Sequence, residues 1–191
     1  EKQYNSPHPN SHHAYGSTYG EHREKLEFNI NQHIKLKEYC DSINIGYSAS
    51  VWDVTSAKEI VKINPKIIKI PSACNNNYNI IEILLNEYKG DIHISLGMTT
   101  DQERKQLIEF IDNKDQLKRI VLYACTSGYP VSFNDLCLLE ITTLIDELDG
   151  RIKGFGFSGH HLGIAADIAA YTLGAEWIER HFTKNRTWKG T

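Results

Sequence analysis

The sequence predicts an α/β protein with a parallel sheet, here an incomplete segment of a (β/α)8 TIM barrel. Short apolar strand runs alternate strictly with helical segments, and such crossover connections make neighbouring strands parallel. About six strand–helix units fit into the 191 residues, whereas a complete barrel typically takes about 250 residues. No GxGxxG fingerprint follows any strand run, so a dinucleotide-binding fold lacks its main signature.

The composition is that of an ordinary globular chain and excludes several function classes. Hydrophobic residues make up 40% of the sequence, charged residues 24%, and the formal net charge is −3. Neither nucleic acid nor an anionic membrane is therefore expected as a partner. No apolar run approaches the ~20 residues of a membrane span. Four cysteines without CxxC spacing indicate reduced thiols and a cytoplasmic protein, with Cys125 expected in the core.

The first segment differs from the rest of the chain. Residues 1–22 are polar and lack apolar periodicity, which predicts a long loop of the barrel, followed by the barrel domain at residues 23–191. Four histidines in this segment are candidate metal ligands: His8, His12, His13 and His22. A solvated polar loop is the favoured interpretation because nothing in the sequence fixes the geometry of these side chains.

The periodic part begins with a helix expected at residues 25–42, where Leu26, Ile30 and Ile34 recur at helical spacing. Asp53 or Thr55 caps the next helix, and Thr100 with Glu103 forms a capping box. Further helices are expected at 56–63, 78–88, 100–113, 134–148 and 162–173. Strands are expected at 46–51, 66–70, 91–96, 119–124, 152–157 and 175–180.

Polar side chains gather where these strands end, at the edge where parallel α/β proteins carry out their chemistry. Serines follow five of the six strands, and hydroxyls that converge suit a phosphate or carboxylate, with Lys69 supplying charge. Single serines are also ordinary turn residues, so the recurrence carries the argument. The candidate anion-binding and substrate-binding residues are Ser50, Lys69, Ser72, Ser95, Ser127, Tyr129 and Ser158.

Two histidines end the last two strands and are candidate metal ligands. Adjacent strands lie about 4.8 Å apart, so His160 and His181 could reach one divalent ion such as Mn²⁺. The alternative is that both are ordinary polar histidines at a solvent-exposed edge of the sheet. His161 is expected to face outward. Glu179 lies on the same side as His181 and could act as a general base, orient a water, or pair with Arg180.

Two further residues, Lys69 and Tyr129, each have a catalytic and a non-catalytic interpretation. Lys69 could form a Schiff base, as in an aldolase, but phosphate pairing is the simpler role because nothing in the sequence indicates a depressed pKa. Tyr129 precedes Pro130 and fits a turn at least as well as a catalytic role.

Six ordered motifs at these strand ends resemble the sialic acid synthase family over essentially the whole chain. The motifs are YGEH (Tyr19–His22), KIPSACNNN (Lys69–Asn77), SLGM (Ser95–Met98), CTSGYP (Cys125–Pro130), GFSGHHLGIA (Gly156–Ala165) and ERHFTKNRTWKGT (Glu179–Thr191). That family condenses phosphoenolpyruvate with an N-acetylated amino sugar, such as N-acetylmannosamine, to give a nonulosonic acid and phosphate.

The resemblance implies a role for each matching residue. Lys69 and the serines at 72, 95, 127 and 158 match positions that hold the phosphate and carboxylate of phosphoenolpyruvate. His160 and His181 match the metal ligands, for Mn²⁺ or alternatively Mg²⁺ or Co²⁺. Glu179 matches the glutamate of the ERH motif, and Tyr129 a tyrosine beside the sugar. The resemblance also implies a homodimer in the full-length protein.

Three departures from the family pattern qualify this expectation. Cys74 stands where members often have a glutamate that contacts the sugar, which leaves the amino sugar open. The first two barrel strands and the C-terminal antifreeze-like domain are absent, and the sequence stops at Thr191. We therefore expect residues 1–191 alone to lack activity. The alternatives to a synthase are a Schiff-base aldolase of the same fold and a non-catalytic sugar-binding barrel.

Overall fold

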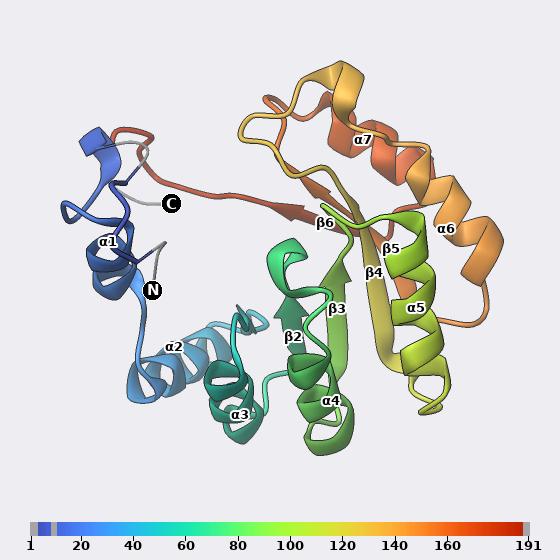
Figure 1. The fold of residues 1–191 in the computed structure, drawn as a ribbon, viewed down its shortest axis with the longest axis horizontal. Helices are drawn as coiled ribbons and strands as arrows, with labels where there is room; N and C mark the ends of the chain where they lie inside the picture. Colours follow the sequence, from blue (N-terminus) through green and yellow to red (C-terminus); the bar gives the residue numbers. More distant parts are fainter. Residues whose placement is uncertain (1–3, 9–10, 189–191) are drawn as a thin grey trace. The chain divides into compact units, whose positions relative to one another are not determined.

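A computed structural model of the chain describes residues 4–8 and 11–188 and divides it into two compact units (Figure 1). One unit comprises Glu1–Lys35 and Phe182–Thr191, and the other Leu36–His181. Parts of the predicted N-terminal loop (1–3 and 9–10) and the end of the last motif (189–191) lie outside the described residues.

The larger unit is built on six parallel strands in the order β1–β2–β3–β4–β5–β6. The sheet curls into a half-barrel with helices between the strands (Figure 1), which confirms the predicted fold class. Residues 154–159 have the pattern GxGxxG. They form a paired strand and not the strand-to-helix turn that a dinucleotide-binding fingerprint requires. The strands are β1 (Ser48–Ser50), β2 (Ile67–Ile70), β3 (Asp91–Ser95), β4 (Ile120–Cys125), β5 (Gly154–Gly159) and β6 (Trp177–Arg180).

Helices connect consecutive strands, as alternation predicted. Asp53 caps α3 and Thr100 caps α5, each in a capping box. The connecting helices are α3 (Val54–Ile63), α4 (Tyr78–Glu87), α5 (Asp101–Asp112), α6 (Glu140–Leu148) and α7 (Ala165–Thr172), with α2 (Ile30–Ser42) preceding β1. None of the helices in the described part of the chain is long and apolar enough to cross a membrane.

Strand alternation divides the sheet into two faces. Apolar side chains such as Ile68, Ile92 and Leu122 are buried in the hydrophobic core. The residues between them, including Lys69, His93 and Tyr123, point to the other face, which is the interior of the half-barrel. The outer face of the sheet therefore packs into the hydrophobic core, and the inner face presents polar side chains to the interior of the half-barrel.

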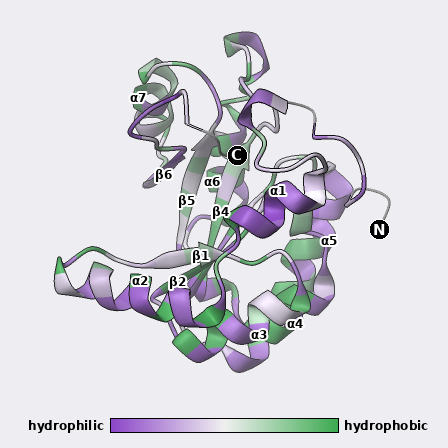
Figure 2. Ribbon diagram, turned by 90° about the vertical axis from the view of Figure 1, so that its left-hand side faces the viewer, coloured by the Kyte–Doolittle hydropathy of each residue, from purple (hydrophilic) through white to green (hydrophobic). Residues whose placement is uncertain are grey.

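The smaller unit corrects the predicted N-terminal loop. Thr18 and Glu21 form a capping box, so helix α1 (Tyr19–Leu26) begins inside the segment predicted as loop, after a short 3₁₀ turn at Ser11–His13. The single helix expected at 25–42 is in fact the end of α1 followed by α2. Most of α1 is hydrophilic (Figure 2).

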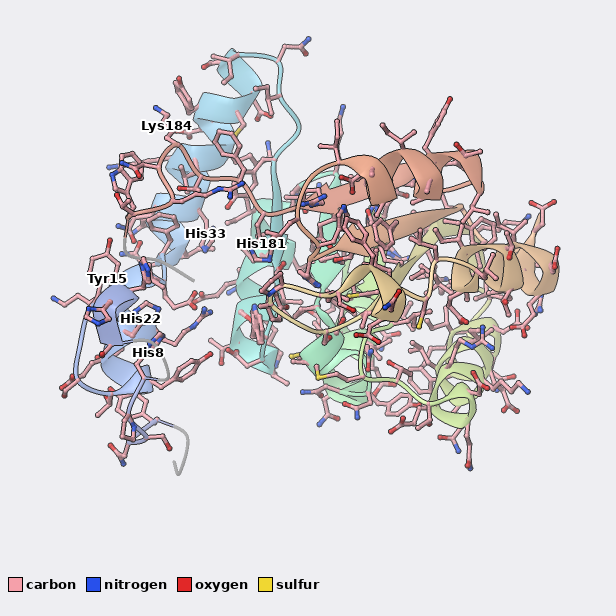
Figure 3. All side chains as sticks on the ribbon, turned by 90° about the horizontal axis from the view of Figure 1, so that it is seen from above. His8, Tyr15, His22, His33, His181 and Lys184 are labelled. Carbon is pink, nitrogen blue, oxygen red and sulfur yellow. The ribbon has the colours of Figure 1, made fainter. Side chains whose placement is uncertain are left out.

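One histidine of this unit, His22, is not solvated. It is buried, which lowers its pKa, and its Nδ1 lies 3.1 Å from the Tyr15 amide nitrogen. The ring centroid of His22 is 4.3 Å from that of His8 and 6.0 Å from that of Tyr15 (Figure 3). Within the described residues no three His, Cys, Asp or Glu side chains form a group that could hold a metal ion.

Two helices begin later than predicted. The expected start of α6 at 134 or 135 lies in a 3₁₀ turn (Phe133–Asp135), and Cys137 then takes a positive φ of 50°, which interrupts the helix before Glu140. The expected start of α7 at 162 precedes Gly163, whose φ of 77° is not helical. Both segments become connections at the carboxyl edge of the sheet.

The interior residue His93 makes the fold sensitive to acid. Burial lowers its pKa to about 4, against about 6.5 in an unfolded chain. Between these values the unfolded chain binds a proton that the folded chain does not, so stability falls as pH drops from about 6.5 towards 4. We expect urea unfolding to show a loss of roughly 3 kcal/mol over this window. His93→Gln should flatten the slope and His12→Gln should not; an unchanged slope in His93→Gln would contradict the assignment.

Candidate active site

The inner face of the half-barrel opens at the carboxyl ends of its strands into a pocket of about 490 Å³. All of its lining residues belong to the larger unit. The structure brings together every site residue predicted from the sequence: Ser50, Lys69, Ser72, Ser95, Ser127, Tyr129, Ser158, His160, Glu179 and His181. Trp52, Met98, Cys125 and Arg180 line the same pocket and were not among the candidates.

A cation and an anion face each other at the base of this pocket. Lys69 on β2 is only 7% exposed, and its ammonium forms a salt bridge with Glu179 on β6. Burial lowers the pKa of Lys69, although Glu179 opposes this. For Glu179, burial favours the neutral acid, but the Lys69 charge outweighs it and lowers the pKa. Glu179 is therefore a carboxylate, and its partner is Lys69 and not the neighbouring Arg180 that was considered.

Serine hydroxyls form a cradle around a glycine that leaves room for them. A Cβ atom added to Gly97 would lie 2.5 Å from Ser127 Oγ and 2.6 Å from Ser72 Oγ. The Gly97 amide donates a hydrogen bond to Ser72 Oγ over 3.1 Å. Ser158 is buried beside them, and the buried Ser95 Oγ has no hydrogen-bond partner in the part of the chain that is described. A buried hydroxyl without a partner in the protein needs one from a water or a ligand atom.

The two candidate metal ligands lie side by side. The ring centroids of His160 and His181 are 5.5 Å apart, and the exposed ring of Tyr129 is 4.4 Å from His160. His160 Nδ1 lies 3.0 Å from the Thr126 carbonyl oxygen, which can only accept. The neutral ring therefore carries its hydrogen on Nδ1 and its lone pair on Nε2.

The protonation of both rings bears on whether a cation fits here. Burial, assisted by His160, lowers the pKa of His181, which favours the neutral form that binds metals. A hydrogen bond with Cys125 raises the pKa of His160, so a bound cation would displace a proton. Imidazole nitrogens are common ligands of divalent ions, but the described residues contain no group of three His, Cys, Asp or Glu side chains that could hold a metal ion.

Arg180 fastens the loop that carries His160. Its Nη2 donates to the His161 carbonyl over 2.7 Å, and its Nη1 donates to the Gly163 carbonyl over 2.9 Å and to the Asp167 carboxylate. His161 itself is 3% exposed, which corrects the expectation that it faces outward. The loop after β5 is thus tied to β6, and the tie fixes the position of one histidine against the other.

Cys125 differs from its predicted place in the core. It lines the pocket; burial opposes its ionisation, but hydrogen bonds with His160 and Ser72 lower its pKa. Trp52 is half exposed and lines the same pocket. Cys74, at the position of a family glutamate, is buried, and its Sγ is 3.4 Å from the Trp52 carbonyl. The positions of these side chains depend on the conformation of the loops after the strands, which the alternation of residues along a strand does not predict.

Fold and pocket together define a parallel β/α half-barrel whose pocket is lined by serine hydroxyls, Lys69 and two imidazoles. The NeuB family model matches residues 1–191, and the chain belongs to the NeuB family. It is 34% identical over 181 residues to an N-acetylneuraminate-9-phosphate synthase of Drosophila melanogaster, covering 95% of this chain and 48% of that protein. The Homo sapiens protein of the same name is also 34% identical, with 95% and 49% covered.

A solved structure agrees with these sequence relatives. The chain matches an N-acetylneuraminic acid (sialic acid) synthetase from Leptospira borgpetersenii, solved with citrate, at a TM-score of 0.79 and 28% identity. The match covers 88% of this chain and 59% of that one. The chain thus spans about half the length of the curated relatives it matches, and these relatives are named as synthases of sialic-type acids.

The serine cradle depends on the missing side chain of Gly97. In Gly97→Ala the new Cβ would displace the hydroxyls of Ser72 and Ser127, so we expect the affinity for phosphoenolpyruvate or inorganic phosphate to fall tenfold or more. Calorimetric titration of the full-length protein measures this loss. The matched control is Gly46→Ala, where a Cβ meets nothing within 4 Å. Equal affinities of Gly97→Ala and the parent would refute the cradle.

Proposed function

We propose that the full-length protein condenses phosphoenolpyruvate with an N-acetylated amino sugar, N-acetylmannosamine or a related sugar, in a metal-dependent reaction. The products are a nonulosonic acid of the sialic type and phosphate. The observation that carries the proposal is the convergence of four residues on one pocket: buried Lys69, Ser95, whose hydroxyl has no partner among the described residues, His160 and His181. Membership of the NeuB family supports the same reaction class.

In this proposal the base of the pocket binds phosphoenolpyruvate. Lys69 supplies the positive charge, and the hydroxyls at 72, 95, 127 and 158 donate to the phosphate and carboxylate oxygens. Charge-assisted hydrogen bonds are strong in a pocket that excludes much of the water. The ion pair with Glu179 keeps Lys69 an ammonium despite its burial, so the cradle is ready to accept an anion.

The histidine pair is the proposed site of a divalent cation, Mn²⁺ or alternatively Mg²⁺ or Co²⁺. When bound, such an ion polarises the aldehyde of the open-chain sugar as a Lewis acid. The Thr126 carbonyl holds His160 in the tautomer whose Nε2 has a lone pair. The Tyr129 ring lies against both imidazoles, 4.4 Å and 5.9 Å from their centroids, and shields one side of them.

The remaining residues act on the reacting atoms. C3 of phosphoenolpyruvate attacks the aldehyde carbon, water adds to C2, and phosphate leaves by cleavage of its C–O bond. In this proposal the Glu179 carboxylate accepts the proton of the attacking water. Lys69 and the serine hydroxyls donate to the charge that develops on the tetrahedral intermediate.

A Schiff-base aldolase is the second candidate because burial lowers the pKa of Lys69, which the sequence did not indicate. Borohydride trapping with a carbonyl substrate distinguishes the two reactions, since only the aldolase gives a covalent adduct at Lys69. A non-catalytic sugar-binding barrel would bind phosphoenolpyruvate without releasing phosphate. We retain three expectations for the complete protein: a homodimer, a cytoplasmic location, and no turnover by residues 1–191 alone.

Phosphate release is the direct test of the proposed reaction. We expect full-length protein with Mn²⁺ and phosphoenolpyruvate to release phosphate only with one of three sugars: N-acetylmannosamine, its 6-phosphate, or a 2,4-diacetamido sugar. Glu179→Gln should lower kcat by about 100-fold or more, since it removes the general base. Glu176→Gln, an exposed carboxyl near the same strand, is the control. Full turnover by Glu179→Gln would exclude the proposed base.

The cation site has a readout that does not need turnover. His181→Ala removes one of two imidazole ligands, so we expect Mn²⁺ affinity, measured by electron paramagnetic resonance of the free ion, to fall at least tenfold. His12→Ala, which alters an exposed histidine of the other unit, should bind Mn²⁺ like the parent. If His181→Ala binds Mn²⁺ as tightly as the parent, the histidine pair is not the metal site.

A further inference from the structure

A second layer of side chains lies beneath the pocket. Strand alternation places every second residue in the barrel interior, so the residues two positions before the pocket lining face the same way, one layer deeper. Below Ser95, Cys125 and Glu179 these are His93, Tyr123 and Trp177. The proposed reaction uses none of them, yet two are polar and buried.

These side chains contact one another and reach the pocket cation. The Tyr123 hydroxyl is 2.7 Å from His93 Nδ1, and the His93 ring lies 4.7 Å from the Trp177 ring at an interplanar angle of 85°. Lys69 Nζ lies over the Tyr123 ring, 4.6 Å from its centroid. This distance is that of a cation–π contact. The layer is therefore connected to Lys69 through one aromatic ring.

Burial keeps both partners of this hydrogen bond uncharged. It lowers the pKa of His93 to about 4 and raises the pKa of Tyr123. At neutral pH the imidazole is uncharged and the phenol keeps its proton. Either group can be the donor, because a neutral imidazole carries its hydrogen on Nδ1 or on Nε2 and a phenol both donates and accepts. In both cases the phenol cannot turn away without leaving a buried polar group of His93 unpaired.

A glycine on the next strand holds the ring from the other side. Gly156 on β5 pairs in register with Tyr123 on β4. A Cβ atom at Gly156 would lie 2.5 Å from Cδ1 and Cε1 of the Tyr123 ring. The ring can lie across β5 only because residue 156 has no side chain. The tether to His93 and the contact with Gly156 are independent, and they fix the same ring.

We propose that His93 and Tyr123 form a positioning pair that fixes the Lys69 ammonium at the base of the pocket. An ammonium has three hydrogens. Glu179 accepts one and the Tyr123 face attracts a second, which leaves the third for a ligand in the pocket that Lys69 lines. An incoming phosphate competes with Glu179 for Lys69, and the ring beneath keeps the ammonium in place during that exchange. The consequence for substrate affinity, but not the positioning itself, rests on the proposed function.

The test compares Tyr123→Phe with Tyr88→Phe in the full-length protein. Tyr88 is equally buried and donates to the Pro65 carbonyl over 2.7 Å, so its variant loses a similar hydrogen bond away from Lys69. One readout is the rate at which Lys69 is acetylated by acetic anhydride, followed by mass spectrometry. The other is KM for each substrate.

For Tyr123→Phe we expect acetylation of Lys69 to rise about fivefold and KM for phosphoenolpyruvate to rise about fivefold. Such a factor corresponds to about 1 kcal/mol, the net value of one hydrogen bond. KM for the sugar and kcat should stay within about twofold of the parent. His93→Phe should behave similarly, and the double variant should add little, because the two residues form one interaction. Tyr88→Phe should lower Tm without altering Lys69.

The acetylation and phosphate-release results separate the positioning pair from the proposed function. Unchanged acetylation of Lys69 in Tyr123→Phe overturns the positioning pair, and so does an equal increase in Tyr88→Phe, which would indicate general loosening. Increased acetylation in a protein that releases no phosphate supports the pair and rejects the proposed function. If Tyr123→Phe does not fold, Gly156→Ala displaces the same ring and should raise acetylation, with Gly46→Ala as its control.

Discussion

The salt bridge between Lys69 and Glu179 is the constraint on which the rest of the pocket depends. The two residues come from β2 and β6, which are four strands apart in the sheet order. In a flat sheet with strands about 4.8 Å apart they would be separated by roughly 19 Å. Their contact therefore requires the curl of the half-barrel. In turn, the curl buries Lys69, and an ammonium buried without an acidic partner would be costly.

The same strand alternation produces both the core and the site. On one face of the sheet the side chains are isoleucine, leucine and phenylalanine, and they are buried in the hydrophobic core. On the other face polar residues converge, and curvature brings them closer than a flat sheet could. Each buried polar group must then find a partner. Tyr123 does so with His93, whereas Ser95 Oγ at the pocket and His93 Nε2 beneath it have no hydrogen-bond partner among the described residues.

The sequence was sufficient to predict the strand ends and their residues, because alternation and turn signals are local. It could not predict partners that depend on curvature and loop paths. Lys69 meets Glu179 across the barrel, Arg180 turns to Asp167, and Cys125 faces the pocket. The missed start of α1 is different, because Thr18 and Glu21 already show capping-box spacing in the sequence. The local sequence therefore contains the signal for this helix start, within a segment whose overall composition is polar and rich in histidine.

Two glycines show how the interior is arranged around absent side chains. Gly97 lets two serine hydroxyls approach the backbone at the upper layer, and Gly156 lets the Tyr123 ring lie flat at the lower layer. Both layers contribute to the surroundings of Lys69. The upper layer places serine hydroxyls in the same pocket, and the lower layer places the Tyr123 ring against the ammonium. A methyl group at either glycine would leave the fold class unchanged but displace the groups around that charge. The geometry of the pocket therefore depends on two positions that lack a side chain as well as on the residue types that line it.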